Sequence, residues 1–136
     1  MDMTLHISRL LAAQIVSETM RFSDEICGLL LGRDNVVEAI EPCANVHATP
    51  ATHFELDPAP LFRALRASRA GGPQVIGYYH SHPSGLAAPS PTDAVQAAPD
   101  GAYWLIAAGD DLTAWRAMRD GAVHGRFDPV SLAIAP

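Results

Sequence analysis

One short stretch, from Val75 to Asp93, constrains the fold more than any other part of the sequence. Residues 75–79 are β-branched or aromatic apart from one glycine, and Gly71-Gly72-Pro73 precedes them, so they predict a strand. His80 and His82 follow directly. Because side chains alternate between the two faces of an extended chain, both imidazoles are expected on one face, roughly 6.8 Å apart along the strand.

A loop rich in proline and glycine then leads to Ser90-Pro91-Thr92-Asp93. Serine at an N-cap and proline at the first helical position predict the start of a short helix that extends to about residue 98. Asp93 would lie in its first turn and face back toward the histidines. Two histidines and one carboxylate form a ligand set of catalytic zinc sites, which leave the fourth position for water.

Each part of this stretch also has a simpler explanation. Pairs of the form H-x-H occur in proteins that bind no metal, and S-x-x-D is the capping-box pattern with a shorter acid at its last position. Capping would account for Ser90 and Asp93 without any ion. It does not account for their place so soon after a histidine pair, and the combination therefore predicts a metal centre.

The spacing resembles the signature of the JAMM (MPN+) metalloprotease family, in which H-x-H is followed after seven residues by S-x-x-D. The matching residues are His80, His82, Ser90 and Asp93. The family also has a glutamate before an apolar strand, and Glu25 precedes the apolar run 26–32. Its position alone favours an exposed turn residue, because glutamate is mostly exposed, and only the resemblance makes Glu25 the expected base.

Two further segments, Asn45 and residues 54–58, resemble short bacterial members of this family, and the resemblance extends from about Leu5 to Phe127. It implies the JAMM/MPN fold, which is similar in outline to the cytidine deaminase architecture. It implies Zn²⁺ as the cofactor, held by His80, His82 and Asp93.

The same resemblance implies a mechanism and a substrate. Glu25 would accept a proton from a zinc-polarised water and pass it to the leaving amine, while the Ser90 hydroxyl would face the oxyanion. The substrate would be a peptide or isopeptide bond after the Gly-Gly tail of a ubiquitin-like or sulfur-carrier protein, or of its conjugates.

The remaining pattern predicts an α/β fold, a mixed β-sheet flanked by helices. Its expected elements are a strand at 4–7, a helix at 9–22 capped by Ser8, a hairpin of 26–32 with 36–41, a helix from Asp57-Pro58, and strands at 103–108, 112–118 and 122–127. Asp120-Gly121 predicts a two-residue hairpin turn. Asp128-Pro129 is expected to end the last strand, which gives one domain over 1–128 and a C-terminal tail over 129–136.

Composition restricts the partners and the location. The net charge of −6 argues against nucleic acid, and no apolar run approaches the ~20 residues that span a bilayer. The N-terminus shows no signal-like segment and the two cysteines suit a reducing compartment, so we expect a cytoplasmic protein. All nine basic residues are arginines. Either genomic composition or avoidance of conjugation through lysine would explain this.

Two other functions remain open at this point. RadC-like proteins carry the same zinc motif and are associated with DNA repair, but the acidic charge of this chain disfavours such a role. Inactive MPN proteins serve as interaction scaffolds, but they lack the metal ligands that this chain has in full. The sequence leaves the oligomeric state open.

Overall fold

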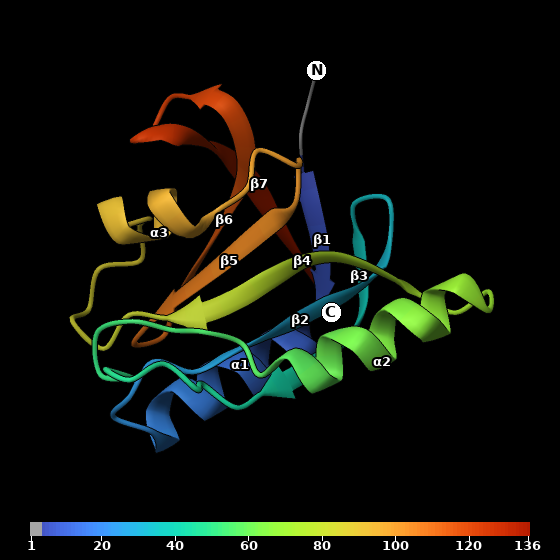
Figure 1. The fold of residues 1–136 in the computed structure, drawn as a ribbon, viewed down its shortest axis with the longest axis horizontal. Coiled ribbons are helices and arrows are strands. Elements are labelled where there is room, and N and C mark those ends of the chain that lie inside the picture. The colour runs from blue at the N-terminus through green and yellow to red at the C-terminus, as the bar shows by residue number, and fades with distance from the viewer. Residues whose placement is uncertain (1–3) are drawn as a thin grey trace.

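A single mixed sheet dominates the structure (Figure 1). The computed structural model describes residues 4–136. Within these residues the strands are β1 (Thr4–Ser8), β2 (Cys27–Arg33), β3 (Val36–Cys43), β4 (Gln74–Ser81), β5 (Tyr103–Ala108), β6 (Asp111–Gly121) and β7 (Gly125–Ala135). The helices are α1 (Arg9–Arg21), α2 (Pro58–Arg69) and α3 (Pro91–Gln96).

The strands are ordered β1-β3-β2-β4-β5-β6-β7, and β7 pairs with β1 to close the sheet into a barrel. The β4–β5, β1–β3 and β1–β7 pairs are parallel, and the remaining pairs are antiparallel. The predicted mixed sheet with flanking helices is therefore confirmed. Its closure was not predicted. The likeness to the cytidine deaminase architecture stays a prediction.

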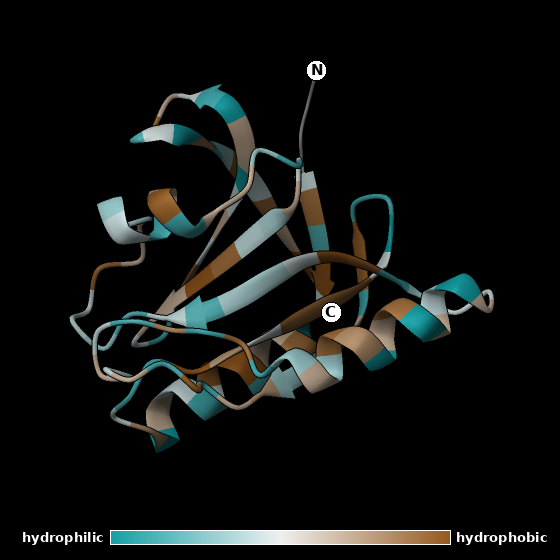
Figure 2. Ribbon diagram, in the orientation of Figure 1, coloured by the Kyte–Doolittle hydropathy of each residue, from teal (hydrophilic) through white to brown (hydrophobic). Residues whose placement is uncertain are grey.

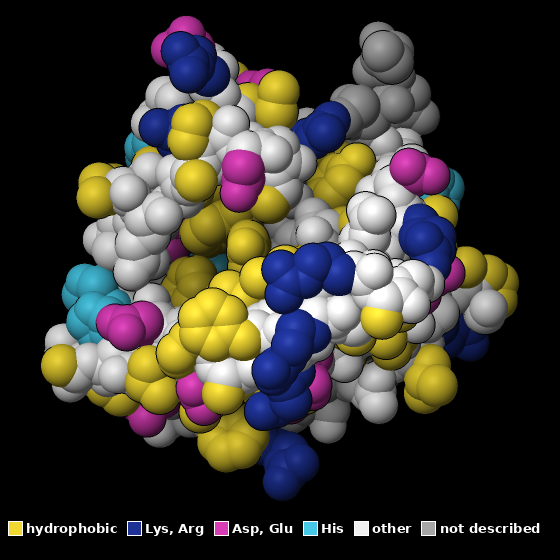
Figure 3. Space-filling view, turned by 45° about the vertical axis from the view of Figure 1, so that its right-hand side comes forward, with side chains coloured by type: hydrophobic (Ala, Val, Ile, Leu, Met, Phe, Trp, Pro, Cys, Tyr) yellow, Lys and Arg dark blue, Asp and Glu magenta, His cyan; other side chains and the backbone are white. Residues whose placement is uncertain are grey.

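Local signals place the helices where the sequence predicts them. Ser8 caps α1, its Oγ accepting a hydrogen bond of 3.1 Å from the Leu11 amide. Asp57 caps α2 in the same way, through the Ala59 amide at 3.1 Å. The exposed side of α2 carries its arginines, which appear as dark-blue side chains gathered over this part of the surface in Figure 3.

The predicted turn at Asp120-Gly121 is wrong. Asp120 adopts a positive φ of 58°, which aspartate tolerates better than most residues, but it does so inside β6, where the register shifts between Ala117 and Gly121. The chain turns at residues 122–124 instead, and Gly121 pairs with Gly125. The dipeptide therefore forms an irregularity in the strand.

The expected break at Asp128-Pro129 is also wrong. β7 continues to Ala135, and Pro129 lies opposite Trp115 of β6. Pairing with β1 begins only at Ser131, so Pro129 lies outside that ladder and its missing N–H leaves no partner of β1 unpaired. Most of the segment that the sequence sets apart as a tail, residues 129–136, thus belongs to the sheet.

Two hydrophobic clusters fill the interior. One packs α1 against the sheet through buried residues that include Leu5, Ile15, Leu30 and Leu105. The other, with Phe54, Trp104 and Phe127 among its members, lies beside the end of β4. Figure 2 shows β2 as hydrophobic, whereas the final residues of β4 are hydrophilic. Buried polar side chains therefore concentrate at one end of a central strand. None of the helices among the described residues has the length and hydrophobicity to cross a bilayer.

Candidate metal centre

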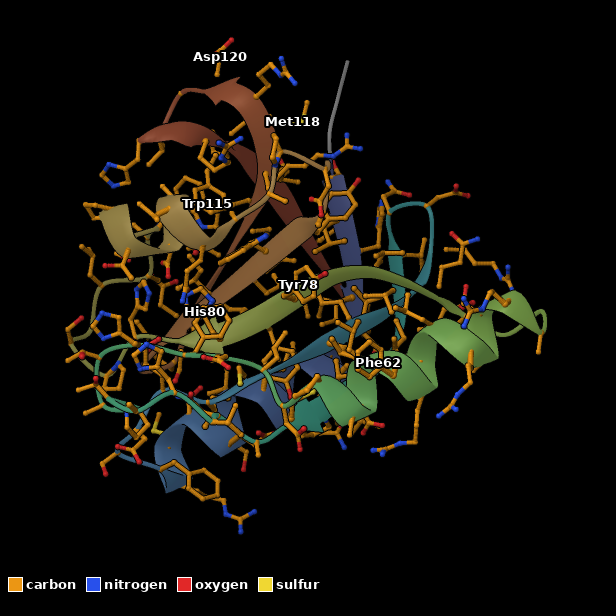
Figure 4. The ribbon with its side chains drawn as sticks, in the orientation of Figure 1. Phe62, Tyr78, His80, Trp115, Met118 and Asp120 are labelled. Carbon is orange, nitrogen blue, oxygen red and sulfur yellow. The ribbon has the colours of Figure 1, made fainter. Side chains whose placement is uncertain are left out.

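The end of β4 places the two histidines, as the sequence predicts. His80 lies opposite Cys27 of β2 and Ile106 of β5, so hydrogen-bonded strands flank it on both sides. His82 follows, and its amide donates to the Ala107 carbonyl at 2.8 Å. His80 is fully buried and His82 is 8% exposed. Figure 4 shows His80 at the end of this strand, next to α3 and the loops around it.

Three side-chain atoms converge beside these rings. The Nε2 atoms of His80 and His82 are 3.0 Å apart. Oδ2 of Asp93 lies 3.2 Å from Nε2 of His80 and 3.1 Å from Nε2 of His82. The fold thus brings together the three residues for which the sequence suggests metal binding, although 11 residues separate His82 from Asp93.

The capping box at Ser90 and Asp93 is present, and it coexists with this convergence of side chains. Ser90 Oγ accepts a hydrogen bond from the Asp93 amide, and Asp93 Oδ2 accepts one from the Ser90 amide, each at 3.0 Å. This Oδ2 atom is the one that faces both histidines. The capping box therefore orients the carboxylate toward the imidazoles, and the two interpretations are not alternatives.

A backbone carbonyl selects the tautomer of His82. Nδ1 of His82 lies 2.8 Å from the Leu86 carbonyl, which can only accept, so Nδ1 carries the proton of the neutral imidazole, and in that form Nε2 keeps a lone pair for a metal. Such outer contacts commonly orient histidine ligands of metals. His80 is held by ring packing instead, with Phe54 stacked at 4.3 Å and Trp104 edge-on at 5.5 Å between ring centroids.

The charges at the centre suit a cation. Burial alone would raise the pKa of Asp93, but hydrogen bonds with His80 and His82 hold it well below its ordinary value, so this carboxylate is ionised. Burial lowers the pKa of His80, which favours the neutral imidazole that a metal requires. For His82, burial opposes protonation, but the contact with Asp93 raises its pKa.

Glu25 is buried, which decides against the exposed-turn interpretation. Its carboxylate and the ring nitrogens of His80 and His82 lie within 4.8 Å of one another. Burial raises the pKa of Glu25 from 4.5 to about 7, the range in which a general base works at neutral pH. A cleft of about 150 Å³, lined by Glu25, His82 and Ser90 among others, opens beside this group.

The loop after β3 holds the backbone of Glu25. The Glu25 amide donates to the Pro50 carbonyl at 2.8 Å, and the Asn45 side chain donates to the Glu25 carbonyl at 2.9 Å. Asn45 also binds the His53 carbonyl at 2.9 Å and accepts from the amides of His47 and Glu55 at 3.1 Å. Asn45, which the sequence marks only through the family resemblance, thus organises the loop beside Glu25, the candidate general base.

Ser81 connects Ile26, the residue after Glu25, to the strand that carries the histidines. It is 1% exposed and lies between His80 and His82. Its Oγ accepts a hydrogen bond of 2.9 Å from the Ile26 amide, and its own amide donates to the Ile26 carbonyl at 3.1 Å. The residue next to Glu25 is therefore fixed to the histidine strand. Only the choice of a small hydroxyl residue between two histidines could have indicated this contact.

We expect Ser81→Ala to destabilise the fold by about 1–3 kcal/mol, because it leaves the buried Ile26 amide without a partner. Urea unfolding measures this loss. Ser84→Ala is the matched control, since Ser84 is exposed in the following loop and should change stability by less than about 0.5 kcal/mol. Equal stability of Ser81→Ala and the wild type would show that the contact contributes nothing.

The geometry of the three ligand atoms fits zinc. Ligand atoms about 2.0–2.1 Å from a tetrahedral ion lie about 3.3 Å from one another. The three separations here are 3.0, 3.1 and 3.2 Å, close to the edges of such a tetrahedron. Two imidazoles and one carboxylate match the donors of catalytic zinc sites, and the Glu25 carboxylate lies within 4.8 Å of a ring nitrogen of each histidine.

Comparisons with known sequences point to one family. A family model described as prokaryotic homologs of the JAB domain matches residues 8–120. A desampylase of Haloferax volcanii is 39% identical over 88 residues, which are 63% of either chain. A probable TtuB-protein conjugate cleaving protease of Thermus thermophilus is 44% identical over 70 residues, 52% of this chain and 47% of the relative. The matched part thus spans less than two-thirds of these relatives.

Solved structures show the same fold. A solution structure of a protein from Desulfitobacterium hafniense superposes with a TM-score of 0.80 at 24% identity, covering 96% of this chain and 92% of the other. A JAB1/MPN domain protein from Archaeoglobus fulgidus gives 0.58 at 20% identity, covering 95% and 97%. Together with the match over most of the sequence, these findings confirm the resemblance: the chain belongs to the family of prokaryotic homologs of the JAB domain.

Proposed function

We propose that this protein is a zinc-dependent isopeptidase that cleaves the bond after the Gly-Gly tail of a ubiquitin-like or sulfur-carrier protein. The observation that supports this most is the convergence of His80, His82 and Asp93 beside a buried Glu25. The names of two relatives, a desampylase and a probable TtuB-protein conjugate cleaving protease, support the substrate class.

Each residue has a separate role in this proposal. His80, His82 and Asp93 hold Zn²⁺, which when bound supplies a Lewis acid that polarises the scissile carbonyl and makes a water more acidic. Glu25 takes a proton from the attacking water and returns it to the departing amine. Burial raises the pKa of Glu25 to about 7 in the metal-free protein, so this site favours a carboxyl group able both to take up and to release a proton.

Ser90 supplies the donor to the oxyanion in this mechanism. Its Oγ already accepts a hydrogen bond from the Asp93 amide, so the hydroxyl proton is free to point elsewhere. Ser90 lines the same cleft as Glu25 and His82. A neutral donor fixed in this way stabilises developing negative charge without having to reorganise during the reaction.

The shape of the cleft supports a substrate without side chains at the scissile bond. Small or rigid residues, Ala51, Thr52, Pro83 and Ser84, complete its lining around Glu25. Such a small cleft, of about 150 Å³, suits a Gly-Gly segment. We propose that this substrate is met in the cytoplasm, and that the net charge of −6 disfavours nucleic acid as a partner.

Cleavage of a linear fusion tests this function. The substrate is a ubiquitin-fold carrier protein that ends in Gly-Gly and is joined to a reporter, and we expect the zinc-loaded protein to cut directly after the second glycine. A chelator should abolish cleavage and added Zn²⁺ should restore it. A fusion with Ala-Ala in place of Gly-Gly is the control. Cleavage that is equal for both fusions, or unaffected by the chelator, would contradict the proposal.

A further inference from the structure

The loop that connects His82 to Ser90 and Asp93 is held by hydrogen bonds from side chains, two of which come from other parts of the fold. Residues 83–89 lie between His82 and Ser90, outside any helix or strand, and Leu86 in this loop is 68% exposed. Three carbonyls in it nevertheless accept hydrogen bonds from side chains. One of these donors is His82 itself, which binds the Leu86 carbonyl. The other two come from the β6–β7 region.

Thr113 of β6 provides the second contact. Its Oγ1 lies 2.7 Å from the Ala87 carbonyl and accepts in turn from Nε1 of Trp115 at 2.9 Å. His124, in the turn between β6 and β7, provides the third, with Nε2 placed 3.0 Å from the Pro89 carbonyl. Because a carbonyl can only accept, this nitrogen of His124 donates.

The hydrogen bond from His124 to the Pro89 carbonyl involves a peptide group whose N–H binds the Asp93 carboxylate. The Pro89 carbonyl and the Ser90 amide belong to one planar unit, so fixing the oxygen also fixes the N–H. That N–H donates to Oδ2 of Asp93, the atom that faces both histidines. A carbonyl that accepts a hydrogen bond also strengthens the donor at the other end of its peptide group. His124 is thus linked through one peptide to a proposed metal ligand.

The conformation of His124 agrees with a specific role. Its φ is 52°, in the left-handed region where glycine is favoured and where histidine occurs less often. Such a residue costs conformational energy and persists when the surrounding structure requires it. The following residue, Gly125, also has a positive φ, of 68°. The turn thus contains two consecutive left-handed residues, and the first of them carries the imidazole.

We propose that His124 is a positioning residue, which through the Pro89–Ser90 peptide holds the Asp93 carboxylate and the Ser90 hydroxyl in register with the histidines. The proposal rests on the proposed function for its effect on catalysis. Its structural part does not depend on activity.

Two substitutions of His124 separate the effect of losing its hydrogen bond from the effect of disturbing the fold. His124→Asn suits a positive φ but is too short to reach the Pro89 carbonyl, whereas His124→Gln carries an N–H donor at a reach similar to Nε2. His6→Asn is the matched control, because His6 is an exposed histidine on β1. Hydrogen exchange of the segment 83–93 is followed on the metal-free proteins, and cleavage of the Gly-Gly fusion on the zinc-loaded ones.

We expect amide exchange of Ser90 in His124→Asn to be about fivefold faster, the factor that one ordinary hydrogen bond contributes. With the fusion substrate, kcat should fall about tenfold or more with KM unchanged, since small displacements of catalytic groups cost this much. His124→Gln should recover most of both properties, and His6→Asn should match the wild type. Wild-type exchange in His124→Asn, or an equal loss in His6→Asn, would overturn the proposal. A wild-type protein that cleaves nothing would instead refute the proposed function, while the exchange data would still test His124.

Discussion

Replacing Glu25 by glutamine is expected to retain bound zinc but to lower the rate of fusion cleavage by about 10²–10⁴-fold. Glutamine preserves the size of the side chain and its place beside His82, but it cannot take a proton from the attacking water. The three proposed ligands, His80, His82 and Asp93, are untouched. Steady-state kinetics measures the loss, and metal analysis of the same preparation shows that zinc is still present.

Stability at neutral pH is the control for this substitution. Burial raises the pKa of Glu25 from 4.5 to about 7 in the folded protein, so the metal-free wild type loses stability as the pH rises through that interval, where only the unfolded chain is fully ionised. Metal-free Glu25→Gln lacks this loss and should be at least as stable as the wild type at pH 7. Cleavage at the wild-type rate would show that Glu25 is not the base.

Replacing His82 by alanine is expected to abolish zinc binding and with it all cleavage above background. Only three protein ligands are proposed, and the substitution removes one of them while leaving the Asp93 carboxylate with a single imidazole partner. Two remaining ligands rarely hold zinc against dilution. Metal content after gel filtration and residual hydrolysis report the two effects.

The control for this variant is His53→Ala. His53 lies in the loop that holds Glu25, and its ring stacks on His47 with 4.7 Å between the centroids, so the protein loses a histidine nearby but no proposed ligand. It should retain one zinc ion per chain. Full zinc occupancy in His82→Ala would contradict the ligand set.

Local chemistry explains what the sequence could predict. Each helix cap uses a backbone amide two or three residues further along the chain, so its role is visible in a few consecutive residues. The capping residues are Ser8, Asp57 and Ser90. The spacing of His80, His82 and Asp93 is equally local, since one strand and one loop bring them together. These elements and their convergence were correctly predicted. Assignment of the metal ligands and of the individual catalytic roles stays a prediction.

Contacts between distant parts of the chain explain what was missed. Asp120-Gly121 and Pro129 carry strong turn and breaker signals, but pairing across β6, β7 and β1 decides their conformation. Ser81 and Ile26 are 55 residues apart, and no periodicity in the sequence connects them. His124 and Pro89 are 35 residues apart, and they meet only after α3, β5 and β6 have brought the chain back beside the loop.

The pairing of Thr4 with Ser131 has a consequence for how the protein is made. Until residues 131–135 have been synthesised, β1 can pair only with β3, so the nascent chain carries the other edge of β1 without its partner up to that point. An unpaired strand edge of this kind invites association with other chains. Slow elongation or a bound chaperone would therefore affect the yield of this protein more than that of one built from neighbouring hairpins.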